Sequence, residues 1–201
     1  MSEQDSKKLF WYRIKFLALI IVFISPFVGG WLALYVFEVR PAPGNYGELV
    51  QPVKKISWPV LEAVDGTRFE SGFGRKWSFV LFTRNGCDES CRTNLFYMRQ
   101  IRILLARNSE RLQNVLVSSE PLDSEMQDIL REYPDLIVIA PYLENNLFDQ
   151  FQLTGQNPVG SSAKMYLVDP DRNFMMHYPA ENDQNRVLED LRKLMKLSQI
   201  G

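Results

Sequence analysis

One uncharged stretch constrains this chain more than any other feature of its sequence. Residues 16–37 read FLALIIVFISPFVGGWLALYVF, which is 22 residues without a charged side chain. At a rise of about 1.5 Å per residue, a helix of this length spans about 30 Å, the thickness of a bilayer's hydrocarbon core. A cleaved signal peptide has a shorter apolar region, of about 7 to 15 residues, and a small-residue cleavage site. The stretch therefore predicts one transmembrane helix that remains part of the chain.

The charges that flank this helix predict its orientation. Four basic residues precede it, at Lys7, Lys8, Arg13 and Lys15. Few basic residues follow it closely, and Lys and Arg concentrate on the cytoplasmic side of membrane helices. We therefore expect residues 1–15 to be a cytoplasmic tail and the chain beyond residue 37 to lie outside the cytoplasm. The expected location is a bacterial inner membrane, with the C-terminal part in the periplasm.

The composition of the outer part predicts one folded domain that does not bind nucleic acid. Residues 41–201 contain 18 Lys and Arg against 21 Asp and Glu, and show no basic cluster. Nucleic-acid binding requires clustered cations that displace counterions from phosphates. Pro41, Pro43 and Gly44 favour an extended linker, expected over residues 38–55. Residues 56–201 are then the expected domain, long enough to bury a sizeable core.

Apolar patterns beyond the linker alternate between strand and helix. Residues 56–70 predict a hairpin around the turn at Asp65 and Gly66. Residues 77–83, WSFVLFT, predict a central strand buried on both faces. The other expected strands are 115–118, 136–140, 165–169 and 174–178, and the expected helices are 88–108, 123–132, 142–153 and 182–197. This order predicts an α/β, thioredoxin-like fold with an added N-terminal β-hairpin, preceded by the transmembrane helix.

Two cysteines, Cys87 and Cys91, lie where the buried strand passes into the first long helix of the domain. The positive end of a helix dipole favours a thiolate at such a junction. A separation of four residues brings the two sulfurs close enough to form a disulfide or to hold one soft cation. A purely structural disulfide is a third interpretation, but a bridge that closes so short a loop adds little stability.

Charged residues surround the cysteines with opposing effects. Asp88 and Glu89 oppose thiolate formation, whereas Arg84 and Arg92 support it. Acidic residues also suit the first turn of any helix, so Asp88 and Glu89 receive no site assignment. A thiol peroxidase is disfavoured, because such an enzyme has a Thr and a Pro just before its attacking cysteine and Thr83 is badly spaced from Cys87.

These motifs together resemble the Sco family of membrane-anchored, thioredoxin-like copper chaperones for cytochrome c oxidase assembly. The resemblance rests on the membrane helix, residues 47–52 with Gly-Glu-Leu and Pro, the strand-to-CxxxC junction at 77–91, SSEP at 118–121 and YLVDP at 166–170. It implies that Cys87 and Cys91 bind copper or exchange electrons with the cysteines of an oxidase subunit. It also implies the membrane, the oxidase subunit and other assembly factors as partners.

The sequence departs from the family pattern at two positions. Ser161 stands where the family has a histidine ligand, and Arg92 stands where a proline usually follows the second cysteine. Two thiolates can still hold Cu(I), which accepts low coordination with sulfur, whereas Cu(II) prefers additional nitrogen or oxygen ligands. The resemblance therefore implies a divergent branch, with Cu(I) as its expected metal.

His177 is the only histidine of the chain and the one further candidate for a metal ligand. Counting back across the turn at Pro170 and Asp171 places it opposite Lys164, near the loop that carries Ser161. The alternative, which we favour, is a partly exposed residue of an edge strand.

Three functions follow from these features. The first is an accessory factor for respiratory oxidase assembly that delivers Cu(I) or reduces client cysteines. The second is a periplasmic thiol-disulfide oxidoreductase, in which Cys87 attacks and Cys91 resolves the mixed disulfide. The third is a metal-free assembly scaffold with a structural disulfide.

Overall fold

The structure is a computed structural model that describes residues 3–37, 44–70, 72–142, 144 and 146–198. The chain divides into two compact units, with the boundary between Gly44 and Asn45. Each unit is described by itself.

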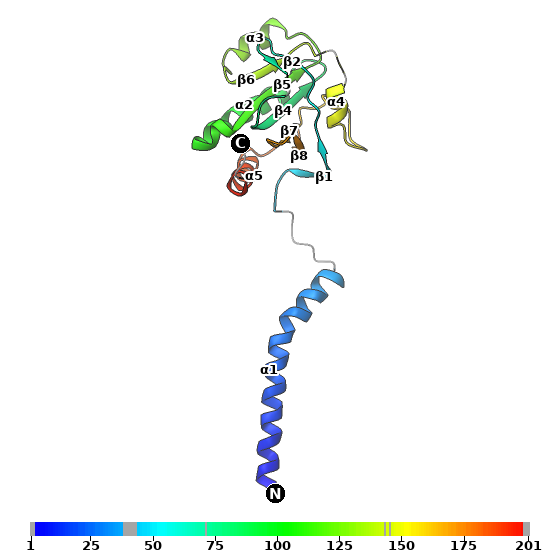
Figure 1. Ribbon diagram of the computed structural model, residues 1–201, viewed down its shortest axis with the longest axis vertical. Coiled ribbons are helices and arrows are strands. Elements are labelled where there is room, and N and C mark those ends of the chain that lie inside the picture. Colours follow the sequence, from blue (N-terminus) through cyan, green and yellow to red (C-terminus); the bar gives the residue numbers. More distant parts are fainter. Residues whose placement is uncertain (1–2, 38–43, 71, 143, 145, 199–201) are drawn as a thin grey trace. The chain divides into compact units, whose positions relative to one another are not determined.

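The first unit is one long helix, α1 (Glu3–Tyr35), and its segment Phe10–Tyr35 is long and apolar enough to span a membrane. The helix begins earlier and ends earlier than the expected span of 16–37. Pro26 lies inside it and cannot donate to the carbonyl of Val22, and Ser25 Oγ donates to that carbonyl instead, at 3.2 Å. Figure 1 shows α1 bending towards its C-terminal end, and a proline inside a helix is a common cause of such a bend.

The second unit contains a six-stranded mixed sheet. Its strands in spatial order are β1 (Glu48–Lys55), β8 (Asn173–Tyr178), β7 (Met165–Val168), β4 (Trp77–Thr83), β5 (Leu112–Ser118) and β6 (Leu136–Ile139). The strands β4, β5 and β6 are parallel, whereas β7, β8 and β1 continue the sheet by antiparallel pairing. All seven side chains of β4 are buried, as expected for the central strand. A separate small hairpin pairs β2 (Leu61–Glu62) with β3 (Arg68–Phe69).

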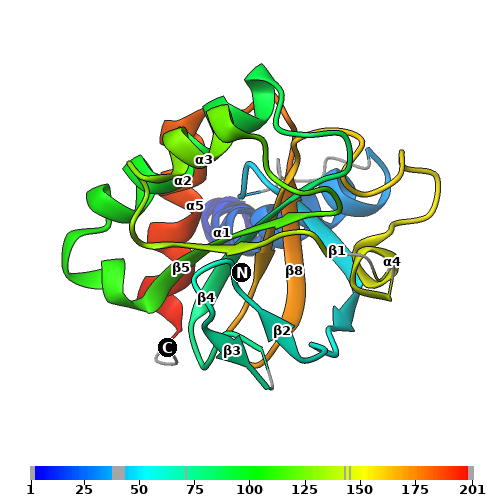
Figure 2. The same cartoon turned by 90° about the horizontal axis from the view of Figure 1, so that it is seen from above.

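Helices cover both faces of this sheet (Figure 2). They are α2 (Glu89–Leu104), α3 (Ser124–Leu130), α4 (Asn146–Phe151) and α5 (Gln184–Leu197), with a 3₁₀ helix at Ala106–Arg111. Residues of α2 and α5 share one core with Phe79, whereas α4 packs into a second core with Phe82 on the opposite face. The β-α-β order, the added hairpin and the closing helix confirm the predicted α/β, thioredoxin-like architecture.

Two expectations about the sheet are corrected. The linker expected over 38–55 ends earlier, because Glu48–Lys55 forms β1 and pairs with β8, while residues 38–43 lie outside the described part. Val50 is the one buried residue of β1, so the strand carries too little apolar periodicity to be recognised. Strand β8 was expected at an edge, but it lies between β1 and β7.

Candidate functional site

The local sequence after β4 explains why Cys87 lies just before α2 and Cys91 lies in its first turn. Gly86 has a φ of +78°, a left-handed conformation that glycine adopts without a steric penalty. Thr83 Oγ1 donates to the carbonyl of Gly86 and so closes this turn. Asp88 then caps the helix, because its Oδ1 accepts from the backbone N–H of Cys91 at 2.8 Å. The junction therefore fixes both cysteines against the end of the central strand.

The two cysteines form a disulfide, and their Cα atoms lie 5.2 Å apart. Their surroundings differ. Cys91 is 2% exposed and packs in the core beneath α2, together with Leu95 and Met98. Cys87 is only partly buried and lies at the edge of this core. A reagent that approaches from solvent therefore meets Cys87 first.

Arg92, which stands where Sco proteins usually have a proline, makes two polar contacts. Its Nη1 lies 2.6 Å from Glu125 Oε1 of α3, and its Nε donates to the carbonyl of Cys87 at 3.3 Å. The hydrogen bond and the charge of Glu125 raise the pKa of Arg92. Because Glu125 pairs with this guanidinium, Arg92 supports a thiolate less than the sequence alone suggests.

The loop that carries Ser161 packs against the residue that follows β4. The backbone N–H of Arg84 donates to the carbonyl of Gly160 at 3.1 Å, and its Nε donates to the carbonyl of Val159 at 2.7 Å. Ser161 is exposed, and its Oγ donates to the carbonyl of Pro158 at 2.7 Å. The position of the family's histidine therefore lies in a loop attached to the cysteine junction, but it offers a hydroxyl group.

His177 lies on the opposite face of the sheet from Cys91. Its neighbours Met176 and Tyr178 belong to the core that contains Cys91, whereas His177 is paired with Tyr166, which belongs to the other core. The expected pairing with Lys164 is wrong. The turn between the strands is longer than two residues, with Arg172 N–H donating to Asp169, and the register shifts between β7 and β8.

His177 is also 4% exposed, not partly exposed as expected. Its Nε2 lies 3.2 Å from Gln156 Nε2 and 3.5 Å from Glu48 Oε2. Burial lowers the pKa of His177, and the charge of Glu48 opposes this effect. Within the described part of the chain, no three His, Cys, Asp or Glu side chains gather closely enough to hold a metal ion.

Sequence reasoning missed Asn94, a buried polar residue of α2 located three residues after Cys91. It is 0% exposed, and its Nδ2 donates to the carbonyls of Ala163 at 2.6 Å and Ala180 at 2.8 Å. Its Oδ1 accepts from Asn182 Nδ2 at 2.6 Å. One signal in the sequence could have indicated its burial: Asn94 lies next to Leu95, on the side of the amphipathic helix that is otherwise apolar.

The fold and the disulfide define a thioredoxin-like protein with a CxxxC pair at the N-terminus of its central helix. The chain belongs to the family described as transmembrane-like, thioredoxin-like, C-terminal domain, whose model matches residues 77–198. No curated protein matches the chain.

Solved structures with the same fold include Sco proteins and thiol:disulfide interchange proteins. Apo Sco1 from Thermus thermophilus is 21% identical, with a TM-score of 0.57 over 77% of this chain and 99% of that one. Yeast Sco1 with copper bound is 18% identical, with a TM-score of 0.58 over 73% of this chain and 91% of that one. A thiol:disulfide interchange protein from Bacteroides sp. is 14% identical, with a TM-score of 0.52 over 73% of this chain and 92% of that one. The Sco-like thioredoxin fold predicted from the sequence is confirmed by this likeness.

Proposed function

We propose that this chain is a membrane-anchored thiol-disulfide protein that reduces a disulfide of a client protein outside the cytoplasm. The observation that carries the proposal is the Cys87–Cys91 disulfide at the start of α2, with one cysteine near the surface and the other in the core. This asymmetry suits a dithiol in which one cysteine attacks and the other resolves.

The reaction follows from the two positions. In the reduced chain, the thiolate of Cys87 attacks one sulfur of the client disulfide, the client's S–S bond breaks, and the leaving thiolate takes up a proton. Cys91 then loses its proton and attacks the sulfur of Cys87, which releases the second client thiol. The client gains two electrons and two protons, and Cys87 and Cys91 become a disulfide. An extracytoplasmic dithiol reductant must then restore the reduced chain.

The proposed location is the periplasmic face of a bacterial inner membrane. The helix α1 has the length and composition of a membrane span, and the basic residues before it favour a cytoplasmic N-terminus. A disulfide also suits an oxidising compartment. An anchored domain meets membrane-embedded clients at a raised effective concentration.

The proposed client is a copper-binding subunit of cytochrome c oxidase, whose cysteines must be reduced before they can bind metal. The support is the likeness in fold to the Sco proteins. One of them is described as having a disulfide switch and as a member of a family of cytochrome c oxidase assembly proteins.

A second candidate function is the delivery of Cu(I) as cargo. The Cα atoms of Cys87 and Cys91 lie 5.2 Å apart at the start of α2, and two thiolates suit Cu(I), which accepts low coordination. Ser161 supplies no nitrogen ligand, so this candidate is limited to Cu(I). His177, on the other face of the sheet, is not part of this proposed site.

Trapping of the mixed disulfide tests the first proposal. In the reduced full chain, Cys91→Ser is expected to accumulate a mixed disulfide with an oxidised oxidase-subunit fragment, because the resolving sulfur is missing. Cys87→Ser serves as the matched control and is expected to accumulate much less. Equal trapping by both variants, or by neither, contradicts the assigned roles.

An anaerobic Cu(I) titration against a competing chelator tests the second candidate. Tight 1:1 binding that is lost in Cys87→Ser supports delivery, whereas no binding above the chelator background removes it. Full oxidase activity in cells that carry the double Cys→Ser variant would contradict both functions. That result would leave a scaffold with a structural disulfide.

A further inference from the structure

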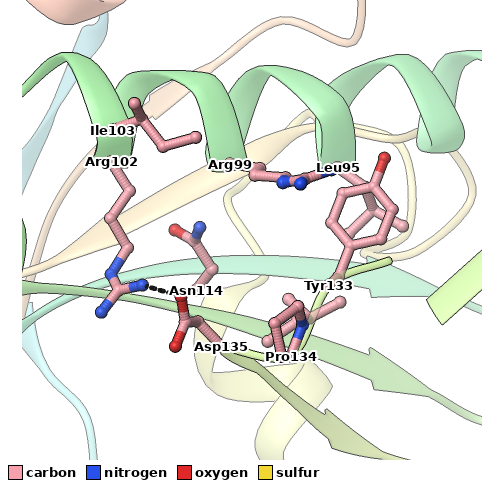
Figure 3. Close-up of a pocket in the computed structure, with 9 residues that line it drawn as sticks. Leu95, Arg99, Arg102, Ile103, Asn114, Tyr133, Pro134 and Asp135 are labelled. Atoms are coloured by element: carbon pink, nitrogen blue, oxygen red, sulfur yellow. Dashed lines mark ion pairs between the residues drawn. The ribbon is translucent and has the colours of Figure 1, made fainter. Parts of the chain in front are cut away.

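A pocket of about 180 Å³ lies between α2 and the turn that precedes β6 (Figure 3). Leu95, Arg99 and Ile103 line it from α2, Tyr133 and Asp135 line it from the turn, and Asn114 of β5 lines it from the sheet. Cys87 and Cys91 do not line it. The pocket is therefore distinct from the disulfide site.

Asn114 brings a buried polar atom without a partner to this pocket. The residue is 5% exposed, and its Oδ1 is buried without a hydrogen-bond partner among the residues that the structure describes. Figure 3 shows its amide group directed towards α2, between Arg99 and Arg102. Buried polar atoms are nearly always hydrogen-bonded, and leaving one unsatisfied is unfavourable. A ligand with an N–H or O–H donor would satisfy this oxygen once a rotation of the Asn114 side chain turns the buried Oδ1 towards the pocket.

The charges of the pocket leave one cation for a ligand. Arg102 pairs with Asp135 at 2.5 Å, and its Nε donates to the carbonyl of Leu112 at 3.1 Å. The guanidinium of Arg99 lies 5.4 Å from the ring centroid of Tyr133, and no described carboxylate pairs with it. Two guanidinium groups and one carboxylate leave a net charge of +1, which is complementary to a monoanion.

The remaining walls are apolar and set the size of the ligand. Ile103 and the ring of Tyr133 offer hydrophobic surface beside the polar groups, and the buried side chain of Leu95 also lines the pocket. An apolar protein cavity of about 150 Å³ accommodates benzene, so this pocket has room for a ring or a branched chain. A single apolar body with a carboxylate and a neighbouring hydroxyl group matches all of these features.

We propose that this pocket binds a small hydroxycarboxylic acid. Its carboxylate pairs with Arg99, its hydroxyl group donates to Asn114 Oδ1, and its apolar body packs against Leu95, Ile103 and Tyr133. Two defined probes test this proposal.

Mandelate and phenylacetate are matched probes, because they differ only in the hydroxyl group. We would titrate each into the full chain in lipid nanodiscs by calorimetry, up to about 10 mM. Mandelate is expected to bind about five- to a hundredfold more tightly, because only its hydroxyl group satisfies the buried oxygen. If the unmodified chain binds the two probes with equal affinity, or does not bind mandelate, the proposal is overturned. Equal affinity is also the result expected if an ordered water already satisfies Asn114.

Two variants assign the polar contacts. Asn114→Leu is expected to reduce the affinity ratio of mandelate to phenylacetate to about one, because the acceptor is gone. Arg99→Gln is expected to weaken both probes about five- to tenfold while the ratio is kept. Arg107→Gln, an exposed arginine outside the pocket, serves as the control and is expected to change neither affinity. A ratio that persists in Asn114→Leu, or affinities that Arg99→Gln leaves unchanged, would overturn the assignment.

Discussion

Asn94 Nδ2 donates to the carbonyl of Ala163 at 2.6 Å, so a buried side chain of α2 holds the loop before β7. The same amide also bonds to Ala180 and Asn182 in the segment that follows β8. Cys91 lies on the same helix, three residues before Asn94. One fully satisfied polar side chain therefore joins the helix that carries the disulfide to both loops beside it.

Asn94→Leu tests the importance of this junction for stability. The variant keeps a similar volume but removes the donor to the carbonyls of Ala163 and Ala180 and the nearer acceptor of Asn182 Nδ2. We expect the free energy of unfolding to fall by about 2 to 4 kcal/mol. Urea unfolding of the oxidised chain measures it, with the exposed Asn185→Leu as control. Losses of similar size in the two variants would contradict the assigned role of Asn94.

The sequence was sufficient to predict the central elements, because their signals are local. Every side chain of β4 is buried, and Asp88 caps α2 where its start was expected. The helix α2 ends at Leu104, earlier than the predicted 108, and the chain continues as a 3₁₀ helix. In contrast, β1 is a strand because it pairs with β8, and pairing between distant segments leaves no periodicity in the segment itself.

The candidate site was only partly accessible from the sequence for the same reason. The position of Cys87 and Cys91 follows from the junction between β4 and α2, which is local. The burial of His177 follows from the pairing of β8 with β1 and β7 on its two sides. The role of Asn94 depends on two loops that are far from it in the sequence.

Gly47→Ala tests the entry of the chain into the domain. A Cβ atom at this position would lie 2.7 Å from Cε1 of Tyr178 and 3.1 Å from Sδ of Met176. The backbone N–H of Gly47 also donates to the buried Asp190 at 2.8 Å, which limits any shift of the chain. We expect the variant to lower the free energy of unfolding by about 1 to 3 kcal/mol.

The matched control for this variant is Gly44→Ala, because a Cβ atom at Gly44 would meet nothing within 4 Å. We expect its free energy of unfolding to stay within about 0.5 kcal/mol of the unmodified chain. Thermal or urea unfolding of both variants measures the difference. An unchanged stability of Gly47→Ala would mean that the ring of Tyr178 moves aside freely.

We expect the free energy of unfolding to fall in mild acid because His177 is buried. Burial lowers the pKa of His177 in the folded chain below the unfolded value of about 6.5, so the unfolded chain binds more protons between these two pKa values. The free energy of unfolding should therefore fall as the pH drops below about 6.5, and this contribution should level off below the folded pKa. Urea unfolding at about pH 7.5 and about pH 5.5 measures the change.

Two variants separate His177 from the other titrating groups. His177→Gln is expected to lose less stability between these pH values, because it has no proton to bind. Glu48→Gln is expected to lose more than the unmodified chain, because the carboxylate of Glu48 opposes the lowering of the pKa of His177. An identical pH dependence in all three proteins would rule out His177 as its source.

Ser161→His is expected to convert the cysteine junction into a site that also binds Cu(II). Ser161 lies in the loop whose Gly160 carbonyl accepts from Arg84 at 3.1 Å, directly beside the start of the CxxxC turn. An imidazole there would add the nitrogen ligand that Cu(II) prefers alongside thiolates. We expect a thiolate-to-copper absorption band on addition of Cu(II) to the reduced variant, and a large increase in affinity over the unmodified chain.

The neighbouring variant Ser162→His controls for a histidine placed anywhere in this loop, and Cys87→Ser in the Ser161→His background tests the thiolate. The absorption band should be absent from both controls, because each lacks one ligand of the proposed set. A band of equal strength in Ser162→His would mean that the loop moves enough to present either residue. A band in the unmodified chain would mean that a nitrogen or oxygen ligand other than residue 161 completes the site.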